Sequence, residues 1–188
     1  MSAMALYGRI AAALLLGAGV TFLPAPNRRL LGALAAVVAL FSLAPVLHGW
    51  MGPPSFTLTQ LALLRLVKPH RPPTPGNLAA ALLVALASVF YPLALGLGPF
   101  DPFDLGYRPQ SLLLFLAPVG LWLAWRRQEI LLTLLGFDLL AYGLGLFDNL
   151  LSALFDPLLV LLAAIRLAGL ARPAARALRA RMSRAATP

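Results

Sequence analysis

Residues 78–98 read LAAALLVALASVFYPLALGLG, a run of 21 residues without a charged side chain. A helix needs about 20 predominantly apolar residues to cross the hydrocarbon core of a bilayer, so this stretch predicts a membrane-spanning helix. We expect six such spans, at 5–25, 30–50, 78–98, 109–125, 129–146 and 150–171. The first run has no clean small-x-small cleavage site at its end, which favours a retained helix over a cleaved signal peptide.

The composition of the whole chain also indicates a membrane protein. Of its 188 residues, 61% are hydrophobic and 11% are charged, whereas soluble domains carry about 25% charged residues. A soluble fold of this size leaves roughly a third of its chain surface exposed, which excludes a soluble enzyme, a secreted disulfide-rich module and a disordered tail. We predict an all-α polytopic membrane protein, with a transmembrane bundle at 1–171 and a basic cytoplasmic tail at 172–188.

Basic residues outnumber acidic residues by 15 to 6, and 14 of the 15 are Arg. Most of them flank apolar runs, where they set orientation and contact lipid headgroups, and none of the clusters is interleaved with aromatic side chains as in a nucleic-acid site. Placing both termini in the cytoplasm puts 12 basic residues inside and leaves Arg28, Arg29 and Arg108 outside. We therefore expect a bacterial inner-membrane protein with both termini cytoplasmic, with membrane lipids and other membrane subunits as partners and no nucleic acid.

The longest predicted loop, 51–77, is expected in the cytoplasm. Thr57 and Gln60 form a capping-box pattern, which predicts a short helix at about 57–68. This helix is too short to span, so we expect it to lie at the membrane interface with Arg65 and Lys68 toward headgroups. A docking surface for a cytoplasmic partner is the alternative. The tail is expected to bind headgroups or an acidic partner through five arginines: Arg172, Arg176, Arg179, Arg181 and Arg184.

Five of the six acidic residues follow a phenylalanine, and four of them fall near the predicted extracytoplasmic surface: Asp101, Asp104, Asp148 and Asp156. Together with Arg108 they would form an acidic patch that binds a ligand. An Asp before Pro or Asn is also typical of a helix start, which fits three of the four. Under this capping interpretation, 148–155 is a short interfacial helix and the sixth span begins at Pro157.

Asp138 differs from these acids because it lies in the middle of the predicted span 129–146. A charged side chain at the bilayer centre costs about 2.5–3.5 kcal/mol on insertion scales, so Asp138 must face a protein interior or a wet cavity. It is either a proton or cation site, or a protonated carboxyl group that joins helices through a hydrogen bond. The candidate partners for that bond are Ser42, Ser88, Thr133 and Tyr142.

Three prolines, Pro45, Pro92 and Pro118, fall inside predicted spans, where each removes a helical hydrogen bond and allows a kink. His48 and His70 have no acidic neighbours and do not make a metal pair. Cysteine is absent, and no Ser-His-Asp, HExxH or Walker pattern is present, so we expect no metal and no cofactor.

The lack of a catalytic set favours a non-enzymatic subunit or scaffold of a larger envelope-associated complex. Two alternatives remain open. The first is a small proton- or cation-coupled transporter that uses Asp138. The second is a lipid-modifying membrane enzyme that uses the extracytoplasmic carboxylates.

Overall fold

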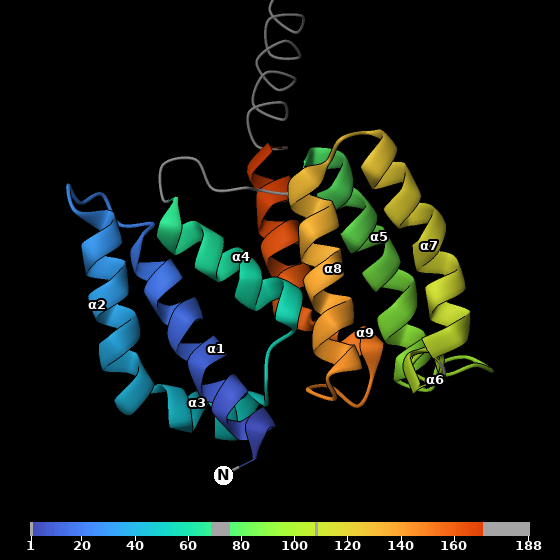
Figure 1. The fold of residues 1–188 in the computed structure, drawn as a ribbon, viewed down its shortest axis with the longest axis horizontal. Coiled ribbons are helices and arrows are strands. Elements are labelled where there is room, and N and C mark those ends of the chain that lie inside the picture. Colours follow the sequence, from blue (N-terminus) through green and yellow to red (C-terminus); the bar gives the residue numbers. More distant parts are fainter. Residues whose placement is uncertain (1, 69–75, 108, 171–188) are drawn as a thin grey trace, which may run out of the picture.

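The computed structural model describes residues 2–68, 76–107 and 109–170, and this part of the chain is all-helical, without a β-strand. The nine labelled helices are α1 (Ala3–Val20), α2 (Arg28–Phe41), α3 (Ala44–Met51), α4 (Phe56–Val67), α5 (Asn77–Ala94), α6 (Asp104–Tyr107), α7 (Pro109–Trp125), α8 (Glu129–Gly143) and α9 (Leu150–Leu154). A further helix follows at 157–170. Most of the longer helices run side by side between an upper and a lower end in Figure 1, with α3, α6 and α9 at the lower end.

Three helical segments are long and apolar enough to cross a membrane, namely α1, α5 and Leu150–Leu170. The bent pair of α2 and α3 makes a fourth if it is counted as one span. The helices α4 and α7 are apolar but shorter. The all-helical prediction is therefore confirmed, and these lengths agree with a membrane protein. The number of six spans is not confirmed and stays a prediction.

The predicted second span is broken near its middle. The helix α2 ends at Phe41, α3 begins at Ala44, and the two helices meet at an angle of 70°. Pro45 occupies the first turn of α3, where its missing N–H is tolerated. Pro92 and Pro118 lie inside α5 and α7, which both continue past them, so kinks at these two residues stay a prediction.

The helices α1 and α2 pack closely because glycines lie where their backbones meet. A Cβ atom added to Gly17 would lie 2.5 Å from the carbonyl oxygen of Gly32 and 2.7 Å from the Cβ of Ala36. Small residues at such a spacing let two membrane helices approach until their backbones touch. Below this crossing, a cluster of buried alanines continues the contact: Ala12, Ala13, Ala39 and Ala44.

The helix α4 inclines through the middle of the molecule, between the α1–α2 pair and the group of α5, α7 and α8 (Figure 1). Near its start, the hydroxyl groups of Tyr7 in α1 and Thr59 lie 2.8 Å apart. Near its end, Arg65 donates a hydrogen bond to Thr21 at the end of α1. The predicted helix at 57–68 therefore exists as α4, and one side of it packs against α1, α8 and α9. Its position at the membrane interface stays a prediction. Within the predicted loop 51–77, the described residues 51–68 carry the chain from the lower end of α1 to its upper end.

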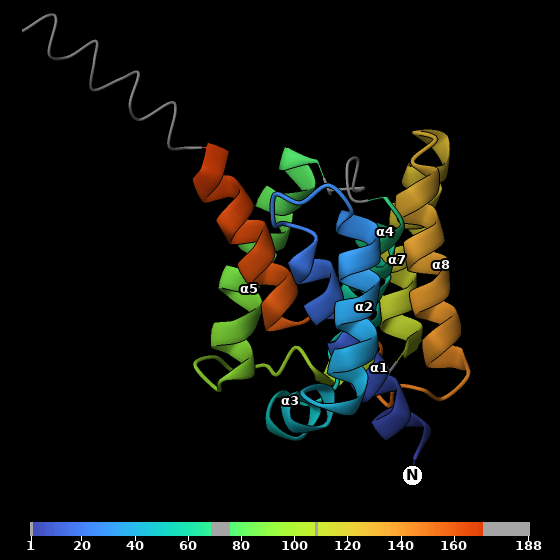
Figure 2. The same ribbon diagram turned by 90° about the vertical axis from the view of Figure 1, so that its left-hand side faces the viewer.

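The start of α1 and the end of the helix 157–170 lie at opposite ends of the molecule. In Figure 1, α1 begins at the lower end, whereas 157–170 finishes at the upper end, where Arg166 donates a hydrogen bond to Asn77 at the start of α5. Figure 2 shows the helix 157–170 beside α5, and α3 across the lower end. The helix α4 runs toward the upper end, in the same direction as α1, which accounts for this placement. The cytoplasmic position of both termini stays a prediction. The predicted tail, 172–188, lies outside the described residues.

Candidate functional site

The beginning of α4 is buried in the interior and gathers most of the buried polar side chains. Ser55 is the residue that caps this helix, since its side-chain oxygen accepts a hydrogen bond from the N–H of Leu58 (3.2 Å). Ser55 is fully buried. Because a helix end inside an apolar bundle has no contact with water, its free backbone groups need partners that the protein supplies. The capping residue is thus Ser55 and not Thr57, which leaves Thr57 and Gln60 available for other contacts.

Asp138 in α8 accepts hydrogen bonds from both of these side chains. Thr57 Oγ1 donates to Asp138 Oδ2 (2.6 Å), and Gln60 Nε2 donates to Asp138 Oδ1 (2.7 Å). Thr57 Oγ1 also lies 3.1 Å from the Leu154 carbonyl oxygen, and Gln60 Nε2 also lies 3.2 Å from the Leu134 carbonyl oxygen. Asp138 is only 1% exposed, so its carboxyl group is enclosed by α4, α8 and α9.

Three of the four predicted partners of Asp138 bond elsewhere. The hydroxyl groups of Ser42, Ser88 and Thr133 each donate to a backbone carbonyl three or four residues earlier in their own helix. Thr57 and Gln60 were read from the sequence only as a helix start. Their spacing of three residues places them on one face of a helix, and this polar pair was the signal for the contact with Asp138.

Asp156 lies at the same end of α4. Its Oδ1 accepts a hydrogen bond from the N–H of Leu159 (2.8 Å), and its Oδ2 accepts one from the N–H of Ser55 (2.7 Å). The first bond is that of an N-cap for the helix 157–170, with Pro157 at the first helical position. The capping interpretation of Asp156 is therefore confirmed, and the predicted sixth span is interrupted between α9 and residue 157.

The structure does not bring all the predicted outer acids together. Asp101 caps a local turn, because its Oδ1 accepts from the N–H of Phe103. The segment of Asp101 and Asp104 contacts the α8–α9 connection, where Asn149 Nδ2 donates to the Phe103 carbonyl oxygen. Asp156 is instead drawn to α4, while Arg108 and the five tail arginines lie outside the described residues. The proposed ligand role of these acids stays a prediction.

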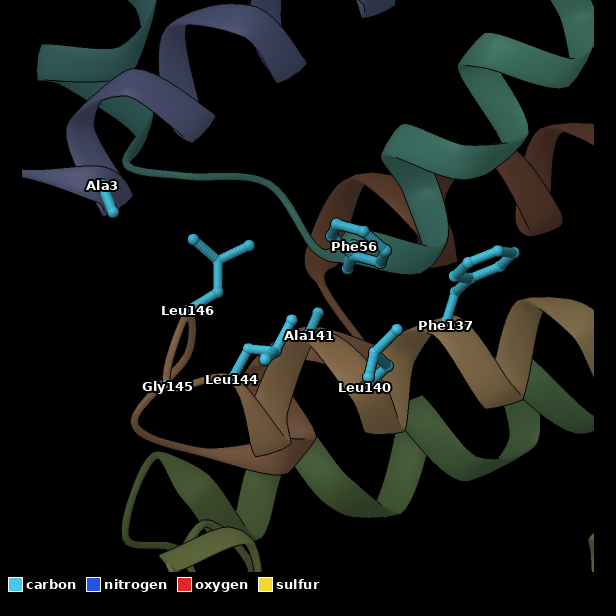
Figure 3. Close-up of a pocket in the computed structure, with 8 residues that line it drawn as sticks. All are labelled: Ala3, Phe56, Phe137, Leu140, Ala141, Leu144, Gly145 and Leu146. Carbon is cyan, nitrogen blue, oxygen red and sulfur yellow. The ribbon is translucent and has the colours of Figure 1, made fainter.

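Two apolar cavities flank this region. One, of about 280 Å³, lies between the start of α1, Phe56 and one face of α8, where Phe137, Leu140 and Ala141 point into it (Figure 3). Asp138 is not among its lining residues. The other, of about 440 Å³, lies between α1, α3 and the start of the helix 157–170, and the lining includes a single charged residue, Asp156.

The arrangement joins α1, α4, α8 and the helix 157–170 through hydroxyl, amide and carboxyl groups. In the described ranges, no group of three His, Asp or Glu side chains is placed to hold a metal ion. Comparison of the chain with models of protein families, with curated proteins and with solved structures finds no match. The chemistry of the buried polar residues therefore has to carry any functional proposal.

Proposed function

We propose that the chain is a non-enzymatic integral subunit of a bacterial inner membrane, which acts as a scaffold within a larger envelope-associated complex. The proposal is supported above all by the enclosed state of Asp138. Both carboxyl oxygens are occupied by side chains of α4, and neither cavity is lined by this residue. A carboxyl group that joins two helices and lines neither of these two cavities suits a structural anchor better than a pathway for ions.

Counting hydrogen atoms gives this interpretation further support. Thr57 has one hydroxyl proton but lies within bonding distance of two acceptors, Asp138 Oδ2 and the Leu154 carbonyl oxygen. A protonated Asp138 would donate to Thr57 Oγ1, and Thr57 would then donate to Leu154. Gln60 has two amide protons for its own two acceptors, so a neutral carboxyl group satisfies the whole set.

We also propose that the upper end in Figure 1 faces the cytoplasm. Seven described basic residues gather at that end: Arg28, Arg29, Arg65, Lys68, Arg126, Arg127 and Arg166. Three acids, Asp101, Asp104 and Asp148, occupy the lower end, and such a distribution follows the positive-inside rule. The six predicted segments would then cross the membrane, with α5 and α7 kinked at Pro92 and Pro118, and α4 would enter it as a seventh segment.

The scaffold proposal is tested by isolating the tagged full chain from its native membranes in a mild detergent. We expect it to copurify with one or more membrane proteins at a fixed stoichiometry that survives a second purification step. Asp138→Asn should leave that stoichiometry unchanged. A full chain that is monodisperse and alone after both steps would contradict the proposal.

One observation favours a transporter as the second candidate. The helix α4 begins in the interior, beside two carboxyl groups, and discontinuous helices of this kind build the ion sites of many transporters. The two candidates differ in liposomes that hold the purified chain alone. The transporter requires a proton or cation flux that Asp138→Asn abolishes, whereas the scaffold predicts no flux in either protein.

A further inference from the structure

A cluster of four basic residues forms where α1, α2 and α4 meet at the upper end. Arg28 and Arg29 begin α2, Arg65 lies in the last turn of α4, and Lys68 ends that helix. The clustering is a product of the fold, since Arg28 and Arg65 are far apart in the sequence and α4 brings them together.

The three arginines are held in place by uncharged partners. Arg65 Nε donates to Thr21 Oγ1 (3.0 Å), and its guanidinium carbon lies 4.1 Å from the centre of the Phe22 ring. Arg28 Nε donates to the Ala25 carbonyl oxygen (3.3 Å), and Arg29 Nη2 donates to the Val67 carbonyl oxygen. These bonds fix the side chains but do not neutralise their charge.

The acidic residues of the chain, all of which the structure describes, do not compensate the cluster. Asp138 and Asp156 are engaged at the other end of α4, and Glu129 begins α8 on the far side of α4 (Figure 1). The remaining three acids lie at the lower end. The carbonyl ends of α1 and α4 contribute about half a negative charge each, which leaves most of the positive charge available to an external anion.

Apolar side chains surround the same arginines. Phe22 is 69% exposed although it stacks on Arg65, and Leu23, Leu30 and Leu31 are exposed beside Arg28 and Arg29. A soluble anion would gain nothing from such neighbours. A phospholipid matches both features, because its phosphate meets the guanidinium groups while its acyl chains cover the exposed apolar side chains.

We propose that Arg28, Arg29, Arg65 and Lys68 form a binding site for the phosphate of an anionic phospholipid, with Phe22 and Leu30 against its acyl chains. The site goes beyond the scaffold proposal and does not depend on it. A lipid at this position would join the α1–α2 connection to the end of α4. It would also stabilise the end of the bundle that we assign to the cytoplasm.

The test uses the full chain in bilayer discs of phosphatidylcholine with a minor fraction of phosphatidylglycerol, and native mass spectrometry counts the lipids retained. The double variant Arg28→Gln with Lys68→Gln removes two charges and no hydrogen bond between elements. The matched control, Arg126→Gln with Arg127→Gln, removes two charges at the same end of the molecule. Each charge lost from the site itself should weaken the preference for phosphatidylglycerol about fivefold at low salt.

We therefore expect a loss of about 25-fold in the first variant and less than about twofold in the control. Lys68→Gln alone should lose about fivefold, and its unfolding temperature shows whether the fold is kept. Equal losses in both double variants would overturn the proposal in favour of diffuse charge. Displacement of the lipid by millimolar inorganic phosphate would overturn it in favour of a soluble anion.

Discussion

At the residue scale, the hydrogen bonds of Asp138 to Thr57 and Gln60 join α8 to α4. The cost of a carboxyl group in an apolar span singles out Asp138 without any structure. Its partners were sought among hydroxyl groups in the other predicted spans, but Ser and Thr in apolar helices commonly bond to their own backbone, as Ser42, Ser88 and Thr133 do. Thr57 and Gln60 fall in a helix that the sequence predicts at the membrane interface, and their shared helical face is the one signal in the sequence for a joint partner.

Two substitutions of Asp138 distinguish a role of its hydrogen bonds from a role of its negative charge. In Asp138→Asn, the amide nitrogen donates to Thr57 and the amide oxygen accepts from Gln60, so both hydrogen bonds to α4 are kept. We predict unfolding in detergent within about 0.5 kcal/mol of the native chain. Asp138→Leu leaves both side chains of α4 without a partner and should lose about 0.6–2 kcal/mol. Equal losses in both variants would show that the negative charge itself is needed.

The contact between α4 and α8 can also be tested by a substitution in α4. Thr57→Val keeps the side-chain volume but removes the hydroxyl group shared by Asp138 and Leu154, and should destabilise the chain by about 1–2 kcal/mol. Thr133→Val is the matched control, since its hydroxyl group bonds only to Glu129 of the same helix, and should stay within about 0.5 kcal/mol. Chemical unfolding in micelles measures both. A control that loses as much as Thr57→Val would refute this ranking.

At the element scale, the sequence predicted most of the helices, including the short helix α4. Apolar runs of 17 residues or more were recognised by length, and Asp156-Pro157 correctly indicated an alternative start for the last helix. A helix of 12 residues was judged too short for the membrane and was assigned to its surface. The helix α4 can begin inside the protein because Ser55 and Asp156 satisfy the backbone at its start. Under the topology that we propose, α4 enters the membrane despite its length.

The crossing of α1 and α2 depends on the absence of a side chain at Gly17. In Gly17→Ala, the added Cβ would lie 2.5 Å from the Gly32 carbonyl oxygen, and we predict a loss of about 1–3 kcal/mol. Gly19→Ala in the same helix meets nothing within 4 Å and should stabilise by about 0.5–1 kcal/mol. Thermal unfolding of the two variants shows whether the substitutions change the stability in opposite directions. A stabilising Gly17→Ala would mean that α1 and α2 do not touch there.

At the scale of the whole molecule, the course of α4 decides on which side the connections lie. The sequence alone treated Arg28 and Arg29 as an exception to the positive-inside rule, because an even number of spans placed them outside. With α4 running in the same direction as α1, the α1–α2 connection lies at the same end as the α7–α8 connection. Under the orientation that we propose, Arg28 and Arg29 are no exception to the rule. The helix α3, which holds Trp50, then lies at the opposite end from the last residue of α7, Trp125, as expected for two interfacial aromatic belts.

The most direct test of this arrangement is the labelling of single cysteines in intact vesicles, which is clean because the chain has no cysteine of its own. Asn27→Cys, Asp104→Cys and Gln128→Cys place one thiol in each of three exposed connections. We predict that an impermeant maleimide labels Asn27→Cys and Gln128→Cys from the same side of the membrane, and Asp104→Cys only from the other. Labelling of Asn27→Cys from the same side as Asp104→Cys would contradict a membrane-embedded α4 and would restore the even-numbered topology.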